Sequence, residues 1–293
     1  MFDNEFVFNQ KSGIDFPNDV QLYVKREDLL HAEVSGNKFR KLKYNILKAK
    51  EKGYEKLLTF GGAYSNHIAA TAAAGRIFDI ATVGVIRGEE LLYNYMKNPT
   101  LFKAQQDGMV FEFVSREQYR YKTKDAFIDF LNHKYGDFYL IPEGGTNGEA
   151  IKGTEEILKE EDAVFDFICV PVGTGGTISG IINRSFENQC VLGFPALKGD
   201  FLFEDIRKFV NKTNWDLILD YHFGGYAKYN NELLDFINNF QTQTQIRLDP
   251  VYTGKMMYGI TDLIQKGFFK KGSKILAIHT GGLQGWNDSI KLK

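Results

Sequence analysis

Lys38 is the residue whose type and position first point to chemistry in this sequence. The stretch SGNKFRKLKYNILKAKEKG, residues 35–53, predicts a basic helix that opens on Ser35, because serine is a common helix cap. Helical spacing then places Lys38 on a face with four apolar residues, Phe39, Leu42, Ile46 and Ala49. The other basic residues of the helix are expected around its outside, namely Arg40, Lys41, Lys48 and Lys52.

The charged form of a lysine in this position is less stable than it is in water. The positive end of the helix dipole and the apolar face both disfavour the ammonium, so the pKa falls. The neutral amine that results is a nucleophile. The alternative is an ordinary solvated lysine whose alkyl stem lies along the helix surface.

The loop GGAYSNH, residues 61–67, is expected to form an anion site between a strand and a helix. Its paired glycines allow a tight turn, and Ser65 is a natural N-cap. The free N–H groups of Asn66 and His67, together with the Ser65 hydroxyl, suit a substrate carboxylate. The alternative is that Ser65 only caps the helix.

A second glycine-rich loop, PVGTGGTISG at residues 171–180, suits a phosphate. Five of its residues would form a cradle at a helix N-terminus, namely Gly173, Thr174, Gly175, Gly176 and Thr177. The Gly-Lys-Ser/Thr of a nucleoside-triphosphate loop is missing. The acidic residue that a dinucleotide fold needs about 20 positions further on is missing too. A glycine-rich turn without a ligand is the alternative.

Two further loops contribute candidates near the end of the chain. LDPVYTGK, residues 248–255, places Tyr252 and Thr253 just before a helix expected to begin near Gly254. HTGG, residues 279–282, follows the last strong strand and contains Thr280. By themselves, both could be ordinary turns.

These loops must be positioned by a scaffold in which strands and helices alternate. Eight short apolar runs predict strands, namely 56–60, 81–86, 109–114, 138–142, 165–172, 190–197, 215–220 and 274–279. The stretches between them have helical spacing, which favours an α/β fold with mostly parallel sheets flanked by helices. The loop PEGGTNGEA, 142–150, is either a crossing between domains or a plain loop with Asn147 as a helix cap.

Composition excludes several classes of partner. The 293 residues carry a formal net charge of −1, from 36 basic and 37 acidic side chains, which gives no global attraction to nucleic acid or a membrane. The two cysteines form no metal-ligand pattern, and Cys169 is expected to be a buried strand residue. Because the sequence has neither a secretory signal nor a long apolar span, we expect a cytoplasmic protein without a metal.

An activated lysine, a phosphate cradle and a carboxylate site together predict Schiff-base chemistry on pyridoxal 5′-phosphate. The motifs SGNKFRKL, GGAYSNH, GTGGT, DPVYTGK and HTGG also resemble, in the same order, those of the fold-type-II pyridoxal-phosphate enzymes. The group most similar is that of D-cysteine desulfhydrase and 1-aminocyclopropane-1-carboxylate (ACC) deaminase. The resemblance extends over about residues 20–285.

The resemblance implies a two-domain fold similar to that of the tryptophan synthase β-subunit, with the cofactor in the cleft. The smaller inserted domain would cover 41–146, and the larger cofactor-binding domain 1–40 and 147–293. The resemblance also implies a small amino-acid substrate and a homodimer.

The resemblance further implies a role for each matching residue. Lys38 would hold the cofactor and take the Cα proton, and Asn66 would bind the cofactor's 3-hydroxyl. Ser65, with Asn66 and His67, would meet the substrate. The glycine-rich loop at 173–177 would cup the phosphate. Thr280 would face the ring nitrogen, and Tyr252 would lie near the ring and the reacting carbon.

Position 253 distinguishes the two activities in this family. The deaminase branch has a glutamate after the tyrosine, whereas this chain has Thr253, as in the desulfhydrase branch. A neutral hydroxyl at the ring nitrogen favours α,β-elimination, so the sequence predicts D-cysteine as substrate, with pyruvate, ammonia and sulfide as products. ACC deaminase is the alternative, and a cofactor-binding protein without turnover is a further one. Tyr64 replaces the family's usual glutamine, and the chain is shorter than its relatives usually are.

Overall fold

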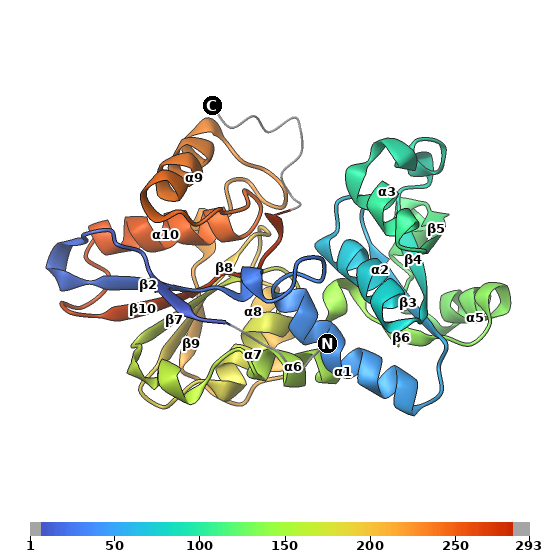
Figure 1. Ribbon diagram of the computed structural model, residues 1–293, viewed down its shortest axis with the longest axis horizontal. Helices are drawn as coiled ribbons and strands as arrows, with labels where there is room; N and C mark the ends of the chain where they lie inside the picture. The colour runs from blue at the N-terminus through green and yellow to red at the C-terminus, as the bar shows by residue number, and fades with distance from the viewer. Residues whose placement is uncertain (1–6, 284–293) are drawn as a thin grey trace.

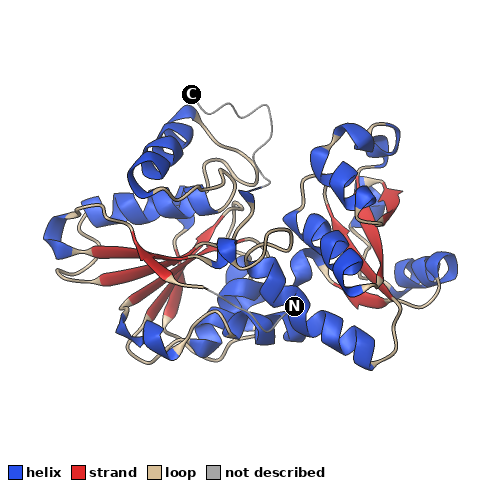
Figure 2. Cartoon of the chain, viewed as in Figure 1, coloured by secondary structure: helices blue, strands red, loops and turns tan. Residues whose placement is uncertain are grey.

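The computed structural model describes residues 7–283 of the chain. The chain forms two lobes, each built around its own mostly parallel sheet with helices packed on the sheet faces (Figures 1 and 2). The expectation of an α/β fold with mostly parallel sheets is therefore confirmed.

The larger sheet has six strands in the order β1-β2-β10-β7-β8-β9. Their bounds are β1 Asn9–Lys11, β2 Gln21–Lys25, β7 Phe167–Val172, β8 Cys190–Pro195, β9 Trp215–Leu217 and β10 Lys274–Ile278. β1 runs antiparallel to β2, whereas the other neighbouring strands are parallel, so the carboxyl ends of β2, β7, β8, β9 and β10 share one edge. The α-helices of this lobe are α6 Gly148–Glu155, α7 Gly176–Arg184, α8 Leu202–Arg207, α9 Asn231–Thr244 and α10 Thr253–Gln265.

The smaller sheet has four parallel strands in the order β5-β4-β3-β6. Their bounds are β3 Lys56–Gly61, β4 Ala81–Arg87, β5 Val110–Val114 and β6 Tyr139–Ile141. The α-helices around it are α1 Asn37–Glu51, α2 Asn66–Phe78, α3 Pro99–Gln106, α4 Arg116–Tyr119 and α5 Asp125–Tyr135. Short 3₁₀ turns complete the described part: η1 Pro17–Asp19, η2 Glu27–Leu29, η3 Glu89–Tyr93, η4 Tyr95–Lys97, η5 Glu143–Gly145, η6 Glu160–Val164 and η7 Leu219–Tyr221.

The eight apolar runs expected to be strands coincide with β3 to β10. β1 and β2 lie outside those runs, because β1 consists of three polar residues, NQK, and β2 is a short strand that begins and ends with polar side chains, QLYVK. Cys169 is fully buried in β7, as expected. Separate apolar clusters fill the space between sheet and helices in each lobe.

The start of α1 differs from the expectation. The helix begins at Asn37 with Gly36 as its N-cap, so Ser35 is not the cap. The Ser35 hydroxyl instead donates to the Asp28 carbonyl oxygen at 3.4 Å. Gly36 has a φ of 59°, and a Cβ there would lie 2.1 Å from the Thr280 carbonyl oxygen. Only glycine lets the chain pass this close to the end of β10.

The expectation that Arg40 and Lys41 lie on the outside of this helix is also wrong. Their exposed fractions are 0% and 2%. Arg40 forms an ion pair with Glu27 of η2, and Lys41 donates to the Gly144 carbonyl oxygen. A pattern with one apolar face cannot show that a helix packs on several sides, as α1 does against α2 and α6.

Loop 142–150 carries the chain from β6 of the smaller sheet to α6, which packs against α1 and α7 (Figure 1). Asn147 caps α6 by accepting a hydrogen bond from the Ala150 N–H at 2.9 Å. The loop is therefore both a capped connection and a passage between lobes. We propose 41–146 as the smaller inserted domain and 1–40 with 147–293 as the larger; residues 1–6 and 284–293 lie outside the described part.

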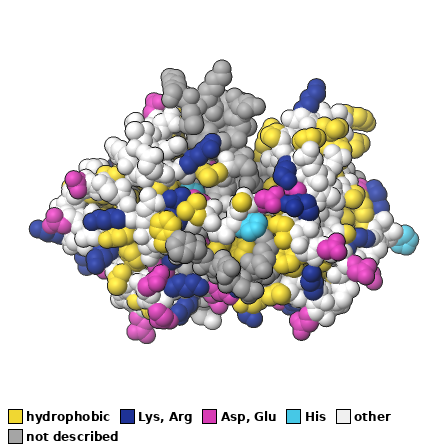
Figure 3. Space-filling model, viewed as in Figure 1, with side chains coloured by type: hydrophobic (Ala, Val, Ile, Leu, Met, Phe, Trp, Pro, Cys, Tyr) yellow, Lys and Arg dark blue, Asp and Glu magenta, His cyan; other side chains and the backbone are white. Residues whose placement is uncertain are grey.

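The surface carries no single-sign patch on the face drawn in Figure 3. Basic and acidic side chains alternate across both lobes there, in keeping with the formal net charge of −1. Among residues 7–283, no helix combines the length and apolarity needed to cross a membrane.

Candidate active site

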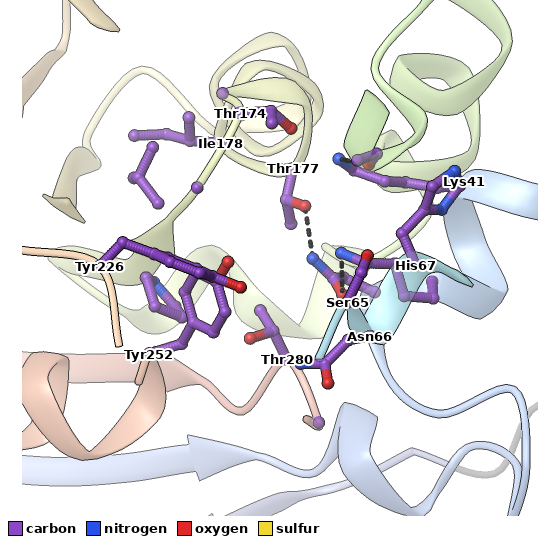
Figure 4. Close-up of a pocket in the computed structure, with 18 residues that line it drawn as sticks. Lys41, Ser65, Asn66, His67, Thr174, Thr177, Ile178, Tyr226, Tyr252 and Thr280 are labelled. Carbon is purple, nitrogen blue, oxygen red and sulfur yellow. Dashed lines mark hydrogen bonds between the residues drawn. The ribbon is translucent and has the colours of Figure 1, made fainter. Parts of the chain in front are cut away.

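A cavity between the two lobes brings together the loops singled out from the sequence (Figure 4). It lies where the carboxyl ends of β7 and β10 meet the N-termini of α1, α2 and α7. All but one of the predicted site residues line it: Lys38, Ser65, Asn66, His67, Gly173, Thr174, Gly175, Thr177, Tyr252 and Thr280. Gly176 is the exception.

Lys38 lies in the first turn of α1 and is partly buried. Its Nζ donates to Asn37 Oδ1 at 3.3 Å, and Asn37 Nδ2 donates to Thr177 Oγ1 at 2.8 Å. Burial lowers the pKa of Lys38 from 10.5 to about 8. Within the described residues no carboxylate forms an ion pair with this amine. A substantial fraction of Lys38 is therefore neutral near pH 8, as a nucleophile requires.

Lys41 lies one turn further along α1 and was not predicted for the site. Its Nζ donates to the Gly144 carbonyl oxygen at 2.8 Å and to Thr146 Oγ1 at 3.2 Å. Burial, and then the charge of Lys38, lowers the pKa of Lys41 well below 10.5. Because residues three apart share a helix face, its spacing from Lys38 is the sequence signal that could have found it.

The N-terminus of α2 faces the cavity through three consecutive residues. Ser65 caps the helix, as predicted, and its Oγ accepts from the Ile68 N–H at 3.3 Å. Its own O–H remains able to donate. The N–H groups of Asn66 and His67 begin the helix and have no carbonyl partner within it. The Asn66 Oδ1 atom is buried without a hydrogen-bond partner among the described residues.

His67 is held in one tautomer by its neighbours. The Thr59 hydroxyl donates to the Ile141 carbonyl oxygen at 2.8 Å, so its oxygen accepts the proton on His67 Nε2, also at 2.8 Å. The other ring nitrogen, Nδ1, is then a buried acceptor, with no partner in the described part of the chain. Burial, followed by the charges of Lys38 and Lys41, lowers the pKa of His67 well below 6.5, so the ring is neutral.

The glycine-rich loop joins β7 to the N-terminus of α7. Gly175 caps this helix with a φ of 83°, a conformation that glycine adopts freely. Thr174 Oγ1 lies 2.7 Å from Thr146 Oγ1, which is bound by Lys41, so the loop is joined to the passage between lobes. Gly176 does not line the cavity. A Cβ there would lie 2.7 Å from Thr146 Oγ1 and 3.1 Å from Lys41 Nζ.

Two tyrosines close the opposite side of the cavity. Tyr252 precedes α10, and Tyr226 comes from the loop between η7 and α9; their ring centroids are 6.1 Å apart (Figure 4). Burial raises the pKa of both phenols, and that of Tyr252 lies well above 10. Tyr226 was not predicted from the sequence, because its loop has no periodic pattern. Tyr252, which it contacts in the folded chain, lies 26 residues further along the sequence.

Thr253 does not present its hydroxyl to the cavity, contrary to the expectation. Thr253 is fully buried, and its Oγ1 donates to Asp249 Oδ2 at 2.6 Å. The same Oγ1 accepts from the Asp249 N–H at 2.9 Å. Thr280, at the end of β10, is the threonine that lines the cavity. Tyr64, which stands where the family usually has glutamine, is 56% exposed and does not line the cavity.

Comparison with known proteins identifies the family. A family model described as "Pyridoxal-phosphate dependent enzyme" matches residues 14–189. An Arabidopsis thaliana protein named bifunctional D-cysteine desulfhydrase/ACC deaminase is 32% identical over 94% of this chain and 75% of its own length. A Pyrococcus horikoshii protein, named provisionally as an ACC deaminase, is also 32% identical, over 90% of this chain and 85% of its own.

The chain belongs to the ACC deaminase/D-cysteine desulfhydrase family of pyridoxal-phosphate enzymes. The crystal structure of an ACC deaminase homologue superposes with a TM-score of 0.80 at 29% identity and covers 95% of this chain and 90% of that one. The resemblance stated from the motifs and the fold type II architecture are thus confirmed.

The residues present fit the family's cofactor. Two buried lysines, Lys38 and Lys41, converge on the cavity beside the neutral His67, and no acidic side chain among residues 7–283 lines it. Two buried lysine side chains without an opposite charge are unfavourable on their own. A dianionic phosphate bound between them would supply that charge. Asn66 Oδ1, which has no hydrogen-bond partner within residues 7–283, adds an acceptor able to meet a ring hydroxyl.

Proposed function

We propose that this protein catalyses α,β-elimination from a small D-amino acid, with D-cysteine as substrate. D-cysteine and water would give pyruvate, ammonia and hydrogen sulfide. The observation that carries the proposal is that, among residues 7–283, no acidic side chain lines the cavity. Thr280 would offer the ring nitrogen a neutral hydroxyl, which would favour expulsion of a good leaving group over prolonged stabilisation of the carbanion.

Bound pyridoxal phosphate would supply an aldehyde for covalent attachment and a ring that accepts the electron pair left at Cα. Lys41 and the loop from Gly173 to Thr177 would hold its phosphate, using charge and the free N–H groups of α7. Asn66 would bind its ring hydroxyl.

The remaining groups would act on the substrate. The Ser65 O–H and the first N–H groups of α2, those of Asn66 and His67, would hold the carboxylate. Lys38 Nζ, neutral in part near pH 8, would remove the Cα proton. The raised pKa of Tyr252 keeps its phenol protonated at neutral pH, so its O–H would donate a hydrogen bond to the departing sulfur.

ACC deamination to 2-oxobutanoate and ammonia is the second candidate. It is favoured by the names of the relatives, several of which refer to ACC deaminase. The same lysine would serve this reaction, and Ser65 with the N-terminus of α2 would again hold the substrate carboxylate. The described part of the cavity lining, however, has no acidic side chain that could meet the ring nitrogen. We keep a homodimer as a proposal from the family likeness.

The decisive experiment measures products from purified protein loaded with pyridoxal phosphate. Pyruvate is assayed with D-cysteine, L-cysteine and D-serine, and 2-oxobutanoate with ACC. We expect pyruvate from D-cysteine and no 2-oxobutanoate from ACC. The reverse result contradicts the proposal, and absence of product from every amino acid indicates a cofactor-binding protein without turnover.

Two lysine variants of α1 provide the matched controls. Lys38→Ala should abolish both the visible absorbance of the attached cofactor and the release of pyruvate. Lys48→Ala, at a partly exposed lysine of the same helix that pairs with Glu149 of α6, should retain both. Equal activity in the two variants would exclude Lys38 as the attachment site.

A further inference from the structure

The loop that carries Tyr226 into the cavity has an unusual backbone. Positive φ angles occur at Phe223, Gly224, Gly225 and Ala227, with values of 52°, 90°, 114° and 56°. Phe223 and Ala227 are not glycines, so the left-handed conformation is unfavourable there. The Tyr226 side chain is 43% exposed. The conformation of the loop therefore decides where the phenol of Tyr226 lies.

Lys255 of α10 lies beneath this loop. Its side chain is 2% exposed, and its Nζ donates to the carbonyl oxygens of His222 at 2.9 Å and of Gly225 at 2.8 Å. These two carbonyls bracket the strained turn immediately before Tyr226. No ion pair with a carboxylate is formed by Lys255 in the part of the chain that the structure describes.

The setting of Lys255 is costly for a cation. Burial lowers its pKa to about 8, although the charge of Asp249 acts in the opposite direction, and its hydrogen bonds go to backbone carbonyls. An apolar side chain of similar length would fill the same space without that cost. What Lys255 provides and an apolar side chain cannot is therefore the pair of hydrogen bonds to the loop.

We propose that Lys255 is a positioning residue that holds the 222–227 loop so that Tyr226 faces Tyr252 across the substrate end of the cavity. The inference rests on the proposed function, since it assigns Tyr226 to the substrate step. Lys255 does not line the cavity itself. It should therefore affect turnover only through Tyr226, and it should leave cofactor affinity unchanged.

The first arm of the test needs no turnover. Amide hydrogen exchange is measured on cofactor-loaded protein at Gly224, Gly225 and Lys228, whose N–H groups donate within the loop. Lys255→Met, which keeps the alkyl stem, should speed their exchange about 10-fold or more. Lys255→Arg, which can still donate to both carbonyls, should retain most of the protection. Lys266→Met, at an exposed lysine of the same helix, is the control and should change nothing.

The second arm is a double-mutant cycle on kcat/KM with the amino acid that the wild type turns over. Lys255→Met should lower kcat/KM by about 10- to 100-fold, because a displacement of about 1 Å can cost that much. In a Tyr226→Phe background the same change should cost less than about threefold. The affinity for pyridoxal phosphate should stay within about twofold in every variant.

The outcomes separate this inference from the proposed function. Unchanged exchange in Lys255→Met, or an equal loss of kcat/KM in both backgrounds, overturns the positioning role. If Lys255→Met does not fold, the Lys255→Arg protein provides the test. Faster amide exchange in its loop would then contradict the positioning role. A wild type that releases no pyruvate refutes the elimination proposal, while the exchange arm still decides how the loop is held.

Discussion

At the scale of single residues, the lowered pKa of Lys38 gives a testable pH dependence. Only the neutral amine attacks an aldehyde, so attachment of pyridoxal phosphate to cofactor-free protein should speed up as pH rises and level off above about 8. An unperturbed lysine, with a pKa of 10.5, would still be gaining rate at pH 9 and 10. The visible absorbance, followed after mixing at each pH, distinguishes the two curves. Lys38→Ala supplies the baseline.

Thr253 supplies a second prediction, because its hydroxyl contacts Asp249 instead of the cavity. Thr253→Val removes the hydrogen bonds at 2.6 Å and 2.9 Å and leaves polar groups of Asp249 buried with fewer partners. We expect a loss of about 1–3 kcal/mol in the free energy of unfolding, measured by denaturant titration. The absorbance of the bound cofactor should not change. A spectral shift without loss of stability would show that Thr253 meets the ring after all.

At the scale of elements, helix α1 places two lysines in the cavity with different tasks. Lys41 joins α1 to the passage between lobes and, through Thr146, to the glycine-rich loop that we propose binds the phosphate. Lys41→Met should weaken binding of pyridoxal phosphate by about 10- to 100-fold, the usual value of one charged hydrogen bond. Titration of cofactor-free protein measures this, with Lys48→Met, at a lysine of α1 that does not line the cavity, as the control. Unaltered affinity would remove Lys41 from the phosphate site.

The elements show which parts of this protein can be predicted from sequence. Strands β3 to β10 were found because buried parallel strands are continuous apolar runs. The burial of Arg40 was missed, since helical periodicity assumes one buried face, and α1 has neighbours on several sides. The loops with glycine and hydroxyl residues indicated the cavity. Tyr226 gave no local signal, because its place depends on a tertiary contact with Tyr252.

At the scale of the whole molecule, the position of Lys38 depends on how α1 is fixed between the lobes. The apolar face of α1 packs into the core of the smaller lobe through Phe39, Leu42 and Ile46. Its polar side is tied back to η2, which directly follows β2 of the larger sheet, by the Arg40–Glu27 pair. A helix anchored to both lobes holds Lys38, the proposed nucleophile, at their junction.

The buried pair therefore supports both stability and the site. Arg40 Nε and Nη2 each lie 2.9 Å from a Glu27 oxygen, and both side chains have 1% exposure or less. Arg40→Leu leaves the Glu27 carboxylate buried without its principal partner, so unfolding free energy should fall by about 3–5 kcal/mol. The Glu27→Leu/Arg40→Leu double variant should recover part of that loss, because no lone charge remains. Arg184→Leu, at a partly exposed pair with Glu160, should cost less than about 1 kcal/mol. Denaturant titration of the four proteins measures these differences, and a double variant less stable than Arg40→Leu would show that Glu27 contributes through contacts other than this pair.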